Sequence, residues 1–145
     1  MPFVETKIVI EAPARDVYEL AKNVEHFPQY MPDVESVTVL ERRGNRLVTR
    51  WKTLVEEAPL EWTEEDLFDD EALTITYRLI EGDLDMFEGA WTFVEGEGNV
   101  RVTLSVEYDF GVPTLAELIG PTLRKKVEEN SEMMLAALKA EAESV

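Results

Sequence analysis

The chain has 145 residues, 45% of them hydrophobic, and a formal net charge of −17. A chain of this length buries roughly 70% of the surface that its unfolded form exposes, so it can form a core without disulfides or a structural metal. It has no cysteine, which excludes disulfides, thiolate metal sites and a cysteine nucleophile. The negative charge argues against binding to a phosphate backbone or an anionic membrane.

These bulk features predict a single domain over residues 1–145, with no metal, cofactor or nucleic-acid partner. No apolar run is long enough to span a bilayer, so we expect no stable membrane insertion. The N-terminal residues lack the apolar core of a secretion signal, which favours the cytoplasm. Gln29 is the only glutamine and Glu is abundant, a composition typical of thermophiles.

The N-terminal part of the chain predicts one strand followed by two short helices. Residues 3–11 are rich in β-branched side chains, which favour a strand. Pro13 suits the first turn of a helix, and the apolar residues within 17–24 recur at helical spacing. Pro28 and Pro32 leave room for only about one further helical turn, so the second helix should end near Met31.

Residues 34–110 predict six antiparallel strands joined by short turns. The stretch is rich in Val, Thr, Ile, Trp and Tyr, and small turn-forming residues interrupt it at regular intervals. The interruptions fall at residues 44–45, 57–59, 69–71, 81–83 and 96–99. The pair Gly44-Asn45 is the sharpest hairpin signal, because a two-residue primed turn needs a left-handed backbone at its centre.

The C-terminal part predicts one long helix of about 25 residues, with a kink near Gly120-Pro121. Thr114 can cap its first turn while Glu117 reaches back to the amide of the cap residue. An apolar stripe continues almost to the end of the chain, and it comprises Leu115, Leu118, Ile119, Leu123, Val127, Met134 and Leu138. The predicted fold class is therefore α+β. A curved antiparallel sheet of about seven strands wraps around the long helix, in the order strand, two helices, six strands, helix.

Side-chain alternation along the strands predicts which residues face this helix. All three tryptophans and two of the four tyrosines fall on the inner face: Trp51, Trp62, Tyr77, Trp91 and Tyr108. By the same parity the charged residues Arg50, Lys52, Arg78, Arg101 and Glu107 face solvent. Buried indole N–H and phenol O–H groups need partners, which favours a pocket, although an ordinary aromatic core is the alternative.

The predicted ligand-binding residues come from this inner face and from the helix opposite. They are Trp51, Trp62, Tyr77, Met86, Phe87, Trp91, Tyr108, Phe110, Val127, Asn130, Ser131 and Met134. Asn130 and Ser131 lie on the apolar stripe, where a ligand, water or the carbonyls of the helix itself could satisfy them. The methionines supply a deformable apolar surface, or they simply fill gaps.

Three side chains are candidates for acid–base catalysis: Glu64, Tyr77 and Tyr108. Glu64 and Asp66 share the face of Trp62, where burial would raise the pKa of a carboxyl group. Charged residues are seldom buried, so the favoured alternative is a wet strand end or a bulge that turns both outward. His26, the only histidine, cannot form a metal site alone, and we predict no metal.

Three segments resemble the START-like (SRPBCC) superfamily: residues 17–32, the run Gly-Ala-Trp-Thr-Phe at 89–93, and Tyr-Asp-Phe-Gly-Val-Pro at 108–113. Within the superfamily, the chain is most similar to the polyketide cyclase/dehydrase and coenzyme Q-binding branch, over essentially its whole length. The resemblance implies a helix-grip fold whose deep cavity holds lipids, quinones or polyketides.

The leading functional hypothesis is the binding or transport of a small hydrophobic ligand that enters near residues 28–32, residues 81–85 and the start of the long helix. An aromatase/cyclase or dehydratase is the alternative. The outward arginines leave no cation for an enolate, so Glu64, Tyr77 or Tyr108 would do the acid–base work. A protein-interaction module is a third hypothesis, and exposed edge strands could also pair in a homodimer.

Overall fold

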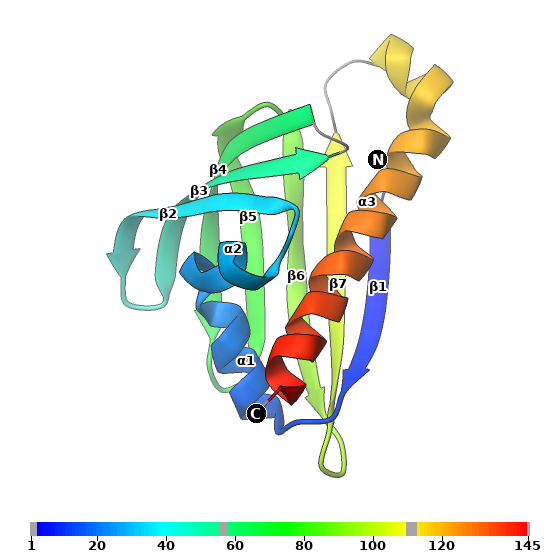
Figure 1. The fold of residues 1–145 in the computed structure, drawn as a ribbon. Coiled ribbons are helices and arrows are strands. Elements are labelled where there is room, and N and C mark those ends of the chain that lie inside the picture. Colours follow the sequence, from blue (N-terminus) through cyan, green and yellow to red (C-terminus); the bar gives the residue numbers. More distant parts are fainter. Residues whose placement is uncertain (1–2, 56–57, 110–112, 145) are drawn as a thin grey trace.

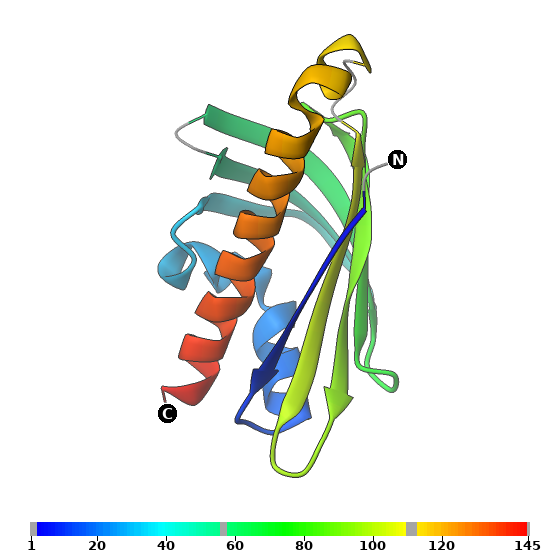
Figure 2. The same ribbon diagram turned by 90° about the vertical axis from the view of Figure 1, so that its right-hand side faces the viewer.

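The computed structural model of the protein describes residues 3–55, 58–109 and 113–144. A seven-stranded antiparallel sheet curves around a long helix, α3 (Pro113–Glu143), as Figures 1 and 2 show. The strands are β1 (Phe3–Ile10), β2 (Val34–Arg43), β3 (Arg46–Val55), β4 (Ala58–Asp69), β5 (Thr74–Gly82), β6 (Met86–Glu95) and β7 (Val100–Asp109). Between β1 and β2 lie α1 (Ala14–Lys22), a 3-10 turn η1 (Val24–His26) and α2 (Phe27–Tyr30).

The observed fold confirms the predicted α+β helix-grip class and the predicted order of elements. The strand order is β1-β7-β6-β5-β4-β3-β2, so the first strand pairs with the last and the other strands follow one another as hairpins. Helix α3 spans 31 residues, longer than the sequence predicted. None of the helices among the described residues combines the length and apolar character needed to cross a membrane.

Two features of the sheet shape the site: a tight turn at Gly44 and a bulge in β4. Gly44, at a φ of 55°, makes the tight turn between β2 and β3, where Arg43 pairs with Arg46. The pairing of β4 with β5 is shifted between Thr63 and Glu64, and such a bulge increases the local bend of the strand. The bend helps β3 and β4 to curl toward α3 (Figure 2).

The C-terminal half of α3 packs against the sheet and the short helices. Leu135 and Leu138 are fully buried there, together with Phe27 of α2. The Lys139 ammonium donates to the carbonyl of Val9 at 2.9 Å and tethers α3 to the edge strand β1. The described turns of α3 before Leu135 are less buried, and Val127, Asn130 and Met134 are only half-buried. One end of the sheet is therefore filled by a core, and the other end is left for a cavity.

Candidate functional site: a cavity between the sheet and α3

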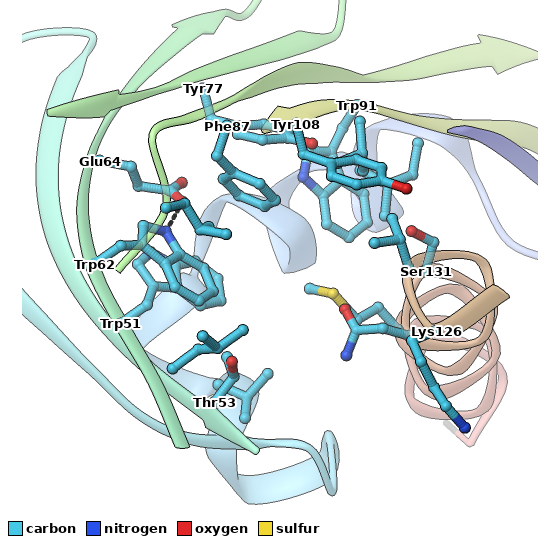
Figure 3. Close-up of a pocket in the computed structure, with 18 of the residues that line it drawn as sticks. Trp51, Thr53, Trp62, Glu64, Tyr77, Phe87, Trp91, Tyr108, Lys126 and Ser131 are labelled. Atoms are coloured by element: carbon cyan, nitrogen blue, oxygen red, sulfur yellow. Dashed lines mark hydrogen bonds between the residues drawn. The ribbon is translucent and has the colours of Figure 1, made fainter. Parts of the chain in front are cut away.

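A cavity of about 410 Å³ lies between the inner face of the sheet and α3 (Figure 3). Its lining is mostly apolar and draws on β2 to β7 and α3. The lining residues are Val34, Trp51, Thr53, Leu60, Trp62, Glu64, Tyr77, Leu84, Phe87, Trp91, Leu104, Val106, Tyr108, Thr122, Lys126, Val127, Asn130, Ser131 and Met134. Thr122 is exposed and Lys126 is half-buried, so the cavity reaches solvent beside this part of α3.

The structure places nearly all of the predicted ligand-binding residues in this lining. Phe110 lies outside the described residues. Met86 is the exception: it is half-buried and is not among the residues that line the cavity, and its part in ligand binding stays a prediction. The reason is strand parity, because Phe87 and Trp91 on β6 face the cavity and their odd-numbered positions put Met86 on the other side.

Besides the catalytic candidate Glu64, the predicted ligand-binding set left out eight lining residues: Val34, Thr53, Leu60, Leu84, Leu104, Val106, Thr122 and Lys126. Strand alternation was enough to find four of them, because each lies two or four positions from Trp51, Trp62 or Tyr108: Thr53, Leu60, Leu104 and Val106. Helical spacing points to Lys126, one turn before Asn130. Leu84 and Val34 lie at a turn and a strand start, where no periodic pattern marks them.

Aromatic rings form the sheet side of the cavity in contact with one another. The indoles of Trp51 and Trp62 stack with their planes 5° apart and their centroids at 5.8 Å. The Phe87 ring is 5.2 Å from both the Trp62 and the Tyr77 ring. Phe27 of α2 supports the Trp51 ring from outside the cavity, at 5.8 Å. Offset and tilted pairs of this kind hold each ring in place and present flat apolar faces to a ligand.

Two carboxyl groups are buried behind this aromatic wall. Glu64 is 4% exposed and Asp66 is 2% exposed, so the expectation that both face solvent was wrong. The bulge next to Glu64 does not turn it outward: Glu64 Oε1 accepts a hydrogen bond from Trp62 Nε1 at 2.7 Å (Figure 3). Asp66 Oδ2 accepts one from the Thr49 hydroxyl at 2.9 Å, and that hydroxyl accepts Trp51 Nε1 at 2.8 Å.

The pKa values of this pair are set by burial and by the contact between the two groups. Burial is the main cause that raises the pKa of Glu64 well above its usual value, and the charge of Asp66 and its hydrogen bond add to the rise. Burial also raises the pKa of Asp66, although hydrogen bonds from Glu64 and Thr49 oppose that rise. Burial thus raises the pKa of both carboxyl groups, and the titration of each depends on the state of the other.

Tyr77 is held by the backbone of β7. Its hydroxyl donates to the carbonyl of Ser105 at 2.6 Å, passing over Gly89 of β6. A Cβ at Gly89 would lie 1.9 Å from that carbonyl oxygen, so only glycine fits here. Burial, with a smaller effect of Glu64 and Asp66, raises the pKa of Tyr77 well above its usual value. Tyr77 thus keeps its proton and directs it at the backbone.

The helix side of the cavity is more polar. Ser131 is 2% exposed, and Asn130 is half-buried beside it. Tyr108 of β7 lies opposite Ser131 (Figure 3). Burial raises the pKa of Tyr108, while Arg124 lowers it and Glu128 adds to the rise. The Lys126 side chain extends away from the aromatic rings in Figure 3. Arg50, Arg78 and Arg101 are exposed as predicted, so the sheet contributes no cation to the described lining.

Comparison with known proteins agrees with this fold and cavity. Residues 10–135 match the sequence profile of a family described as polyketide cyclase/dehydrase and lipid transport. The match covers most of the chain, and the protein belongs to this family. The resemblance that the aromatic and turn motifs indicated is thereby confirmed.

Individual relatives resemble the chain over most of its length. An actinorhodin polyketide synthase bifunctional cyclase/dehydratase of Streptomyces coelicolor is 35% identical over 136 residues, which are 92% of this chain but only 42% of that protein. The crystal structure of TTHA0849 from Thermus thermophilus is 34% identical and superposes with a TM-score of 0.94, covering 99% of this chain and 98% of that one. The Zhui aromatase/cyclase from Streptomyces sp. R1128 shares the fold at 23% identity, with a TM-score of 0.90 and coverage of 98% and 93%.

Proposed function

We propose that the protein binds a small apolar molecule, of lipid, quinone or polyketide type, in the cavity between the sheet and α3. The observation that carries this proposal is the cavity itself. Its volume of about 410 Å³ lies within the range of roughly 300–1,000 Å³ that is typical of small-molecule sites. Protein interiors are otherwise close-packed, so a void of this size walled by aromatic rings supports a ligand rather than imperfect packing.

A pair of matched variants tests the binding proposal. Val106 is buried in the cavity lining, whereas Val94 is 57% exposed on the neighbouring strand. We expect Val106→Phe to fill part of the cavity and to weaken binding of a neutral fluorescent naphthylamine dye at least ~10-fold, about 1.4 kcal/mol. Val94→Phe adds the same ring outside the cavity and should leave the affinity unchanged. Equal affinities of both variants and the wild type would place the dye elsewhere and contradict the proposal.

The second candidate function is acid–base catalysis in the same cavity, of the cyclase or dehydratase type. Its support is Glu64, which lines the cavity and has a pKa raised by burial, as a general acid requires near neutral pH. Tyr77 is less suited because its hydroxyl already donates to the Ser105 carbonyl. The Streptomyces coelicolor relative is named a bifunctional cyclase/dehydratase, and this chain spans less than half of it.

Glu64→Gln separates binding from catalysis. Glutamine keeps the shape and can still accept from Trp62, but it cannot transfer a proton. For an enzyme, we expect turnover of a linear poly-ketone thioester to fall about 100-fold or more while dye affinity stays the same. If the wild type leaves the thioester unchanged, the catalytic candidate fails and the binding proposal stands.

We further propose that residues 1–145 act as one ligand-binding domain, since the sheet, the cavity and α3 share one core. The net charge of −17 supports a small molecule, rather than nucleic acid, as the partner.

A further inference from the structure

The Glu64–Asp66 pair is hydrogen-bonded only through uncharged groups of the described structure. The donors that reach it are the Trp62 indole and the Thr49 hydroxyl, and Thr49 in turn accepts the Trp51 indole. A buried carboxylate usually has a cation beside it. Here two acidic side chains lie beside each other instead, and none of the described residues places a cation next to them to neutralise the negative charge of an ionised carboxyl group.

The other charged and titratable groups of the described residues around the cavity place no cation next to Glu64 and Asp66. Tyr77 donates to a backbone carbonyl and stays neutral. On α3, Arg124 and Glu128 pair with each other at 3.2 Å, so their charges cancel near Tyr108. Lys126 is the only cationic side chain in the described lining, and its ammonium lies toward solvent, 3.8 Å from Glu129. The acidic side chain of the described lining, Glu64, therefore lies on the sheet side, and its single cationic side chain, Lys126, lies on the α3 side (Figure 3).

We propose that the Glu64–Asp66 pair makes the cavity selective for ligands whose buried end is uncharged or cationic, and excludes ligands that would place a carboxylate or other anion against the sheet. An acidic ligand fits only with its anionic group at the open side near Lys126. This inference rests on the proposed binding function and narrows the class of ligand. It favours neutral polycyclic or quinone-like molecules over free fatty acids and other acids.

A series of probes with one ring system tests the selectivity: naphthalene, naphthol, naphthylmethylamine and naphthoate, each titrated by calorimetry near neutral pH. The amine and the acid both carry a charge that must be desolvated, so their ratio reports the sign of the charge on the cavity wall. We expect naphthol to bind best, and the amine to bind at least ~10-fold more tightly than naphthoate.

Two double variants assign the effect to its source. Glu64→Gln with Asp66→Asn replaces both inner carboxyl groups by amides and should reduce the amine-to-acid ratio at least ~5-fold. Glu61→Gln with Glu65→Gln replaces two carboxyl groups on the outer side of the same strand and should leave the ratio unchanged. This control matters because the whole protein is strongly acidic.

The possible outcomes separate a failure of the charge selectivity from a failure of the proposed ligand binding. If naphthalene and naphthol bind but naphthoate binds wild type as tightly as the amine does, the charge selectivity is wrong and ligand binding stands. The same conclusion follows if both double variants change the ratio equally. If no probe binds the wild type, the proposed function fails and the selectivity falls with it. If the inner double variant does not fold, Asp66→Asn alone and the control Glu65→Gln take the place of the two double variants.

Discussion

Glu64 and Glu65 are consecutive residues of β4 in opposite electrostatic surroundings. Glu64 is buried on the cavity side, and no cation lies beside it among the described residues. Glu65 lies on the outer side and pairs with Arg46 and with Arg78, the latter at 3.0 Å. The pKa of Glu64 is raised, chiefly by burial, whereas Arg46 and Arg78 lower the pKa of Glu65. Strand alternation and the placement of arginines thus decide which of the two carboxyl groups binds its proton more tightly.

The largest expected effect is the loss of a ring from the inner face. Trp62→Ala removes the stacking partner of Trp51 and leaves Glu64 without the indole donor. We expect the free energy of unfolding to fall by about 3–5 kcal/mol in urea titrations. Leu67→Ala, on the same strand but 45% exposed, is the control and should change it by less than about 1 kcal/mol. Similar costs for the two variants would mean that the inner face is not the packed side.

Substituting Gly89 tests how closely β6 packs against the hydrogen bond between Tyr77 and Ser105. Gly89→Ala brings a methyl group against the Ser105 carbonyl and the Tyr77 hydroxyl, and we expect a loss of about 2–3 kcal/mol. Gly44→Ala meets open space and strains only a φ of 55°, so it should cost about 1–2 kcal/mol. Thermal unfolding of both variants checks the order, and a larger loss for Gly44→Ala contradicts it.

Glu64 and Glu65 should contribute to stability with opposite dependence on pH. A raised pKa means that the folded state holds the Glu64 proton more tightly than the unfolded state does. Stability is therefore lost as the pH rises from the ordinary value of 4.5 toward the raised pKa. Glu64→Gln should abolish this part of the loss and be more stable than wild type near pH 8. Asp66, whose pKa is also raised by burial, accounts for the dependence of stability on pH that remains in this variant.

Glu65→Gln is the matched control on the outer side. Because the pKa of Glu65 is lowered, its stabilising contribution is present above 4.5 and disappears as the pH falls through the lowered value. The variant should therefore lose stability near neutral pH and converge on the wild type in acid. Urea unfolding across this pH range measures both variants. Parallel pH profiles for the two would show that the faces are not electrostatically distinct.

The smallest expected effect concerns the arginines outside. Arg78 is largely exposed where it meets Glu65, so water and salt screen the pair. Arg78→Ala should lower the free energy of unfolding by less than about 1 kcal/mol, and the difference should shrink at high salt. A large, salt-independent loss would mean that the outer face contributes more to the fold than the contacts indicate.

The fold and most of the aromatic wall could be predicted from the sequence. Alternation is a local property, and it placed Trp51, Trp62 and Trp91 on one face without knowledge of the strand partners. Alternation also placed Glu64 and Asp66 on that face and the arginines on the other, but it could not show that the face is covered along its whole length. The burial of the two carboxyl groups was therefore not predicted. Leu84 was not predicted because a turn has no periodic pattern.

The most direct test of the ligand cavity is a crystal structure of the protein grown with naphthol. We expect electron density for the fused rings between the Trp62–Phe87 wall and Met134, with the hydroxyl group directed toward the sheet. The ring pair and the methionine should move little, because the space for the ligand is already present. An empty cavity with naphthol bound only on the outer surface would contradict the proposed ligand site, whatever the solution affinities.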